Sequence, residues 1–282
     1  MKRNFAFFLI AFILFLAPFF WLKPGEMDLG GDSNRLYFYD PLSFLKYTSI
    51  YAVFTLGKGL FEPNYYYLPY VGLLAFLKLF IPSSLIISLF NGIKLSIGFI
   101  SIYLIVRELL AEAFGKTKQK IIYFSALLAG IFYVASLGSF YMAYFWYRAI
   151  TSHNQVFLNP LIFYLLLKFF LSQKSKYLWT AILTSFIFSP NFGLTSAPPF
   201  FAFYPLAFLF LFLYVKLFGK KPIFWKRVGM GILLFLGVQA FHLLGQIINL
   251  LDNGSWLNQK VFSKLEIEAG GVQYFTAIHG LG

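Results

Sequence analysis

Residues 85–106 read LIISLFNGIKLSIGFISIYLIV, a long apolar run in which Lys94 is the single charge. A helix that crosses a bilayer needs roughly 20 consecutive apolar residues, so this run is long enough to span a membrane. Comparable runs recur along the chain. We predict seven spans, over residues 4–22, 85–106, 121–139, 155–172, 177–190, 199–217 and 228–248. The sequence therefore predicts an all-α, polytopic integral membrane protein.

The composition agrees with this fold class. The chain is 60% hydrophobic and 12% charged, with 39 Phe and 19 Tyr, whereas soluble domains carry about 25% charged residues. The net charge of +13 does not indicate nucleic-acid binding, because the basic residues are scattered in short clusters between apolar runs. The absence of Cys excludes disulfides, thiolate metal sites and cysteine nucleophiles.

The basic clusters predict how the chain is oriented. They are Lys2 with Arg3, Arg107 with Lys116, Lys118 and Lys120, Lys174 with Lys176, and Lys220 and Lys221 with Lys226 and Arg227. All fall on one side of the predicted spans, and cytoplasmic loops are enriched in Lys and Arg. We expect a plasma-membrane protein with a cytoplasmic N-terminus. The first run, residues 5–21, has no small-residue cleavage site after it, so we interpret it as a retained anchor.

The carboxylates indicate where the chemistry lies. Eight of the ten acids fall in two windows: Glu26, Asp28, Asp32, Asp40 and Glu62, then Asp252, Glu266 and Glu268. With basic loops inside, both windows face outwards. We predict one transmembrane module over 1–282, with a first outer loop at 23–84 and a second starting at 249–282. The chain ends in mid-loop at AIHGLG, so we expect it to be the N-terminal part of a longer protein.

Two shorter helices are predicted in the first outer loop. Residues 65–82 contain an apolar run that is short for a span, is interrupted by Lys78 and closes at Pro82, which suits an interfacial helix. Residues 41–56 form the second candidate, with Asp40 as N-cap and Pro41 at the first helical position.

Residues 23–41 read KPGEMDLGGDSNRLYFYDP and hold four acids close to the end of the first span, three of them Asp. Asp28, Asp32 and Asp40 are able to bind a divalent cation through oxygen ligands or to act as a general base. The alternative is that these acids are solvated, or cap helices as predicted for Asp40.

The run DSNRLYFYDP, from Asp32 to Pro41, is followed by a helix-like run and by YYYLPYVGLLAFLKLF at 65–80. This arrangement resembles the amino-terminal part of the GT-C glycosyltransferases, membrane enzymes that take sugar from a polyprenyl-phosphate donor. The closest likeness is to the alpha-(1→3)-arabinofuranosyltransferase-like family. The order of parts is similar over the whole chain, while the motif likeness covers about ten residues.

The resemblance implies a sugar transfer from the lipid-linked donor to a hydroxyl of an extracytoplasmic glycan or lipid. Asp32 matches the family's catalytic base, with Asp40 as second choice, and a divalent cation (Mg²⁺ or Mn²⁺) beside Asp32 is the implied cofactor. The implied substrate-binding residues are Asp28, Arg35, Arg148, Lys94 and Glu266. The acids here are separated rather than paired, which leaves metal dependence open.

Two rival functions remain. A transporter or flippase of lipid-linked glycans predicts charges along the spans and inverted repeats, whereas the sequence shows one strong intramembrane charge, Lys94, and no repeat. Lys94 is equally able to snorkel towards the surface. A non-catalytic membrane subunit requires that Asp32 be replaceable. No P-loop, HExxH or GxSxG motif is present.

Overall fold

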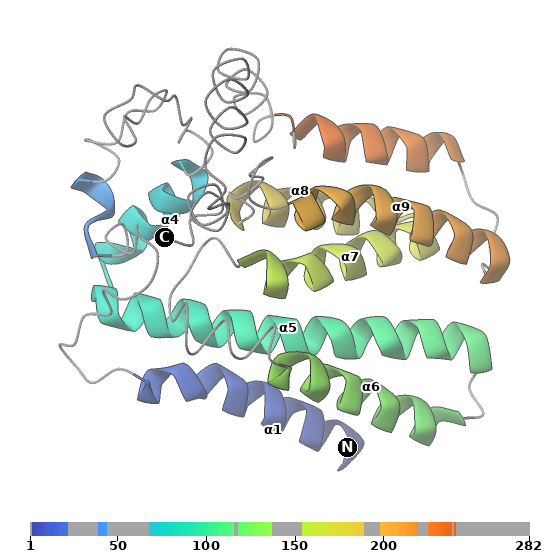
Figure 1. Cartoon of the computed structure of the whole chain (residues 1–282), viewed down its shortest axis with the longest axis horizontal. Helices are drawn as coiled ribbons and strands as arrows, with labels where there is room; N and C mark the ends of the chain where they lie inside the picture. Colours follow the sequence, from blue (N-terminus) through green and yellow to red (C-terminus); the bar gives the residue numbers. More distant parts are fainter. Residues whose placement is uncertain are drawn as a thin grey trace, which may run out of the picture.

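The computed structural model describes residues 2–21, 39–43, 68–115, 118–136, 154–188, 198–218, 225–238 and 240. Within these ranges the chain is helical and contains no strand (Figure 1), which confirms the all-α prediction there. The helices are α1 (Lys2–Leu16), the 3-10 helix η1 (Ala17–Phe20), α4 (Leu68–Lys78), α5 (Ser83–Phe114), α6 (Gln119–Ala135), α7 (Asn154–Ser172), α8 (Ser175–Phe188), α9 (Pro198–Phe218) and a helix at 225–238.

Each predicted span overlaps one of these helices. The longest, α5, extends beyond the predicted 85–106 and has clear stop signals at both ends. Pro82 precedes its first residue, and a proline lacks the N–H that the interior of a helix requires. Gly115 ends it with a φ of 67°, a backbone conformation that favours glycine. Within the segment 65–82, where we predict a short helix, the structure has α4. Of the predicted helix at 41–56, only residues 41–43 are among the described residues.

By length and composition, one helix in the described part of the chain is able to cross a membrane by itself. This helix is α5, whereas the apolar segments within α4, α6, α7, α9 and α1 with η1 run to 10–17 residues. At 1.5 Å per residue, the 14 residues of α8 measure about 21 Å, less than the roughly 30 Å of a bilayer's hydrocarbon core. α8 overlaps the predicted span 177–190 and, like it, is shorter than the roughly 20 residues that a full span needs.

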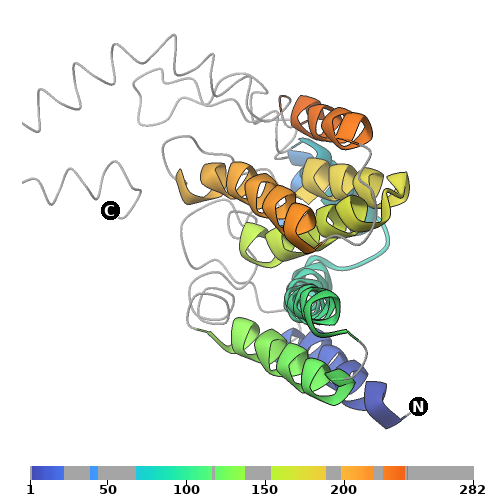
Figure 2. The ribbon, with the colours of Figure 1, turned by 90° about the vertical axis from the view of Figure 1, so that its right-hand side faces the viewer.

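Helix α5 occupies the centre of the bundle. Figure 2 shows α1 and α6 on one side of it and α7, α8, α9 and the helix at 225–238 on the other. Glycines permit this close packing. A Cβ on Gly92 would overlap the backbone carbonyl of Phe15 in α1, and a Cβ on Gly98 would come within 2.9 Å of the Phe157 ring in α7. α5 is thus the element that both halves of the bundle share.

Contacts along α5 show that α1 and α6 run antiparallel to it. In α1, the Phe7 ring lies 4.4 Å from the Tyr103 ring, whereas the carbonyl of Ala11, one turn later in α1, accepts a 2.7 Å hydrogen bond from Ser96 Oγ. In α6, Tyr123 also meets Tyr103, at 6.1 Å between ring centroids. The start of α1, the end of α5 and the start of α6 therefore lie at one end of the bundle.

The remaining helices alternate in direction in the same way. α7 runs parallel to α5, because Phe157 meets Gly98 and Lys168 meets Glu108. Arg227 Nη2 donates a 2.7 Å hydrogen bond to Ser175 Oγ, which brings the start of α8 and the start of the helix at 225–238 together. The basic clusters that are described consequently share one end of the bundle, here called the basic end, as the charge pattern predicted.

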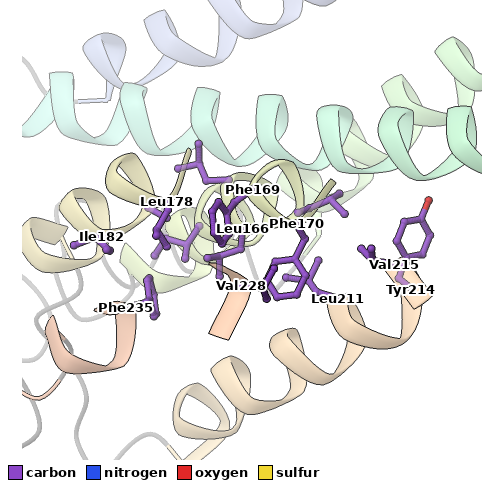
Figure 3. Packing of buried hydrophobic residues seen from close by; sticks show 14 residues of the cluster. Leu166, Phe169, Phe170, Leu178, Ile182, Leu211, Tyr214, Val215, Val228 and Phe235 are labelled. Carbon is purple, nitrogen blue, oxygen red and sulfur yellow. The ribbon is translucent and has the colours of Figure 1, made fainter. Parts of the chain in front are cut away.

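The largest buried apolar cluster joins the later helices. Figure 3 shows side chains of α7, α8, α9 and the helix at 225–238 meeting in one core. The cluster includes Ile162, Leu166, Phe169, Phe170, Leu178, Ala181, Leu211, Val215, Val228 and Phe235. This packing joins these four helices on the side of α5 that faces away from α1 and α6 (Figure 2).

The outward faces of the helices are also strongly apolar. Exposed large apolar side chains include Phe8 and Phe12 on α1, Phe124, Leu128 and Phe132 on α6, Trp179 and Leu183 on α8, Leu206, Leu209 and Leu213 on α9, and Met230 and Leu233 on the helix at 225–238. Soluble monomers rarely expose contiguous apolar patches beyond a few hundred Å². The outer face is therefore suited to an apolar surrounding.

Candidate functional site

The segment Tyr39–Ser43, the end of the quoted acidic motif, is anchored where α4 ends and α5 begins. The carbonyl of Tyr39 accepts hydrogen bonds from Lys78 Nζ and from Ser83 Oγ, the latter at 3.5 Å. The Tyr39 side chain is buried in a cluster with Tyr70 and other residues of α4 and α5. This junction lies at the end of the bundle opposite the basic end, which we call the loop end (Figure 1).

Asp40 is exposed and acts as a helix N-cap. Its Oδ1 accepts a 3.1 Å hydrogen bond from the backbone N–H of Ser43, and residues 41–43 are helical, as predicted. Hydrogen bonds from Ser43 lower the pKa of Asp40 below its ordinary value, and the nearby Lys78 charge acts in the same direction. Asp40 is therefore a well-ionised carboxylate and a weak base. These properties favour holding a cation or accepting a hydrogen bond over removing a proton.

Lys94 lies deep in the bundle. It is 6% exposed, so its side chain does not snorkel to the surface. It follows Ser83 by eleven residues, or about 16 Å along α5 from the loop end. Gly98, one turn further, packs against α7, so Lys94 occupies the face of α5 that meets this helix.

Other polar side chains are buried on the same elements. Ser88, Asn91 and Ser101 on α5 and Asn159 on α7 are each at most 8% exposed. Asn91 and Lys94 are three residues apart and share a helix face. Polar side chains are thus buried on both α5 and α7, which is costly in an apolar environment and is a mark of functional or specific packing.

The other predicted site residues lie outside the described residues. They are Asp28, Asp32, Arg35, Arg148 and Glu266. Of the predicted site, the structure therefore places Asp40 at the surface of the loop end and Lys94 in the interior below it. Within the described ranges, no group of three or more His, Asp or Glu side chains is arranged to hold a metal ion.

The basic end holds an ion pair that the sequence reasoning missed. Lys168 Nζ on α7 lies 2.6 Å from Glu108 Oε1 on α5, and both side chains are about a fifth exposed. One residue along α5, the carbonyl of Leu109 accepts a 3.3 Å hydrogen bond from Tyr214 of α9. A signal was available: Glu108 and Glu112 are the two acids outside both acidic windows.

Comparisons with known proteins give no match: no family model, no curated protein and no solved structure is similar to this chain.

Proposed function

We propose that this chain is a polytopic membrane protein whose helices stand in the bilayer with the basic end on the cytoplasmic side. Two observations support this. Large apolar side chains cover the outward faces of α1, α6, α9 and the helix at 225–238. The described basic clusters share one end because the helices alternate in direction, and basic residues collect on the cytoplasmic side of membranes.

We further propose that the chain is a glycosyltransferase, or its membrane module, that acts at the loop end. It moves a sugar from a polyprenyl-phosphate donor to a hydroxyl of an extracytoplasmic glycan or lipid. Asp32 is the proposed base. Asp40, with its lowered pKa, is assigned to binding a divalent cation or a sugar hydroxyl instead. Arg35, Arg148 and Lys94 are proposed to neutralise the donor phosphate, and Asp28 and Glu266 to bind substrate.

The observation that carries this proposal is the docking of the motif's last residues. Tyr39 and its carbonyl are fixed against α4 and α5, while the Asp40 carboxylate points into solvent at the end opposite the basic clusters. A carboxylate in this place lies where the headgroup of an outer-leaflet lipid would be. It would face a lipid-linked donor from the extracytoplasmic side.

The orientation is testable by cysteine labelling, because the chain contains no native Cys. Leu42→Cys and Lys176→Cys place single thiols on exposed residues at the two ends. In intact cells, a membrane-impermeant maleimide should label Leu42→Cys, and should label Lys176→Cys only after permeabilisation. The reverse pattern, or labelling of both in intact cells, would contradict the orientation.

The activity is testable by native mass spectrometry of the detergent-purified chain with polyprenyl-phosphate sugars. A lipid-phosphate adduct is expected that weakens in Asp32→Asn and after chelation of divalent cations. Asp40→Asn is the matched comparison within the motif. Sugar transfer by the complete protein should be lost in Asp32→Asn. Unchanged transfer in this variant would reject Asp32 as base and favour a non-catalytic subunit.

A flippase of lipid-linked glycans is the second candidate, favoured by the buried polar side chains of α5 and α7, Lys94 among them. It predicts that proteoliposomes move labelled polyprenyl-phosphate sugars across the bilayer without an acceptor. It also predicts that Lys94→Met stops this movement. A transferase needs the acceptor and leaves the lipid in its leaflet.

A further inference from the structure

Four exposed cations gather at the basic end, where α8 and the helix at 225–238 begin. They are Lys174, Lys176, Lys226 and Arg227, here called the α8 basic patch. The hydrogen bond from Arg227 to Ser175 joins the two helix starts, and Val228 is buried in one core with Leu178. The packing of the two helices therefore fixes the positions of the four cations relative to one another.

The positive charge of the patch is poorly compensated. The sequence contains no acid between Glu112 and Asp252, so α7, α8, α9 and the helix at 225–238 carry no carboxylate. Of the three carboxylates in the described residues, Asp40 lies at the loop end and Glu108 is paired with Lys168. The third, Glu112, lies in the last turn of α5 and is near Tyr214 of α9. An anionic partner complements such a surface.

Apolar side chains continue outwards from the cations along both helices. On α8, Lys176 is followed on the same face by Trp179 and Leu183, which are 56% and 58% exposed. On the other helix, Lys226 is followed on the same face by Met230 and Leu233, which are 58% and 67% exposed. On each of the two helices, one face therefore carries a cation near the helix start and exposed apolar side chains further along. We call these two faces the stripes.

This combination distinguishes between anionic partners. A soluble phosphate compound needs only cations, whereas a phospholipid needs cations for its headgroup and an apolar face for its acyl chains. Exposed Trp side chains next to cations are also typical of the level at which headgroups meet hydrocarbon. Trp179 and Trp225, the latter 45% exposed, both lie beside the patch.

We propose that the α8 basic patch is a binding site for an anionic phospholipid of the cytoplasmic leaflet. Lys174, Lys176, Lys226 and Arg227 hold the phosphate, and the acyl chains lie along the stripes that contain Trp179 and Met230. The site rests on the proposed bilayer orientation but not on the proposed sugar transfer. Its function would be to fix the end of the bundle remote from the chemistry.

The test is native mass spectrometry of the detergent-purified chain with phosphatidylglycerol and with phosphatidylcholine of the same acyl chains. We expect phosphatidylglycerol to bind about ten-fold more tightly. The variant Lys176→Gln/Lys226→Gln should remove most of this preference. The matched control is Lys118→Gln/Lys120→Gln, which makes the same charge change at the basic end, at the start of α6, and should keep the preference.

Three results would overturn the proposal. They are equal binding of the two lipids, loss of the preference in both variants alike, and full displacement of phosphatidylglycerol by millimolar pyrophosphate. The last would show that the patch takes a soluble anion. Thermal unfolding checks that the variants are folded, and the single variants Lys176→Gln and Lys226→Gln replace the double variant if it is not. Because no sugar donor is present, these outcomes are independent of the proposed transfer reaction.

Discussion

The two ends of α5 are held in different ways. At the basic end, a side-chain ion pair between Glu108 and Lys168 joins α5 directly to α7. At the loop end, Ser83 of α5 and Lys78 of α4 instead donate hydrogen bonds to the carbonyl of Tyr39, which belongs to a connecting segment. The basic end therefore fixes helix to helix, while the loop end fixes a loop onto helices.

The largest expected effect comes from disrupting the contact of α5 with α1. In Gly92→Ala the new Cβ would overlap a backbone carbonyl oxygen, that of Phe15, so α1 must shift. We expect the free energy of unfolding in detergent to fall by about 3 kcal/mol. Gly229→Ala is the matched control, because a Cβ there meets no heavy atom within 4 Å. Equal unfolding midpoints for the two variants would show that α1 is not packed as described.

Removing the ion pair should loosen the basic end. Replacing one partner of a fully buried pair costs about 3–5 kcal/mol, and Glu108 and Lys168 are about a fifth exposed, so we expect about 2 kcal/mol for Lys168→Met. A double-mutant cycle with Glu108→Gln isolates their interaction. If the two losses simply add, the pair does not couple α5 to α7. The adduct with polyprenyl-phosphate sugars should persist in both variants, because the loop end is remote.

A smaller effect is expected from a single hydrogen bond between α5 and α1. Ser96 Oγ donates to the carbonyl of Ala11 in α1, and its loss in Ser96→Ala should cost about 1 kcal/mol. Ser101 is the matched control on the same helix, because its hydroxyl is buried without a hydrogen-bond partner among the described residues. Ser101→Ala should be neutral or stabilising. A greater loss in Ser101→Ala than in Ser96→Ala would contradict this assignment.

The smallest effect concerns the cap at the loop end. The pKa of Asp40 is lowered in the folded state by its hydrogen bonds with Ser43, so its contribution to stability is present above the ordinary aspartate pKa of 3.8. This contribution is lost as the pH falls through the lowered value. Asp40→Asn should therefore be less stable than wild type at pH 7, and the difference should close below about pH 3.8. A difference independent of pH would reject the cap as its cause.

Much of the helix pattern was predictable because apolar runs and their flanking residues act locally. The apolar run at 85–106 predicted the helix that is found as α5, which begins directly after Pro82. The pair Asp40 and Pro41 predicted the helix N-cap that Asp40 forms. The alternation of basic clusters also predicted the helix directions that the contacts show. We predict seven membrane spans, whereas in the described residues one helix, α5, is long and apolar enough to cross a membrane by itself.

The rest depends on contacts between residues far apart in the chain. Glu108 and Lys168 are separated by 60 positions, and no local pattern shows that α5 and α7 run parallel and adjacent. The burial of Lys94 was predictable from its place in an apolar run, but its position facing α7 was not. Asp32, the residue on which the proposed chemistry depends, lies outside the described residues, so its role stays a prediction.

The central place of α5 has a consequence for how the protein assembles. Its contact with α6 joins neighbours in sequence, and so does that of α7 with α8, so these hairpins close over short loops at little entropic cost. The contact of α1 with α5 instead closes a loop of more than sixty residues, from η1 to Ser83. α1, although it precedes α5 in the chain, should therefore find its place only after α5 has formed. The small residues Gly92 and Ser96 form the surface of α5 against which α1 packs.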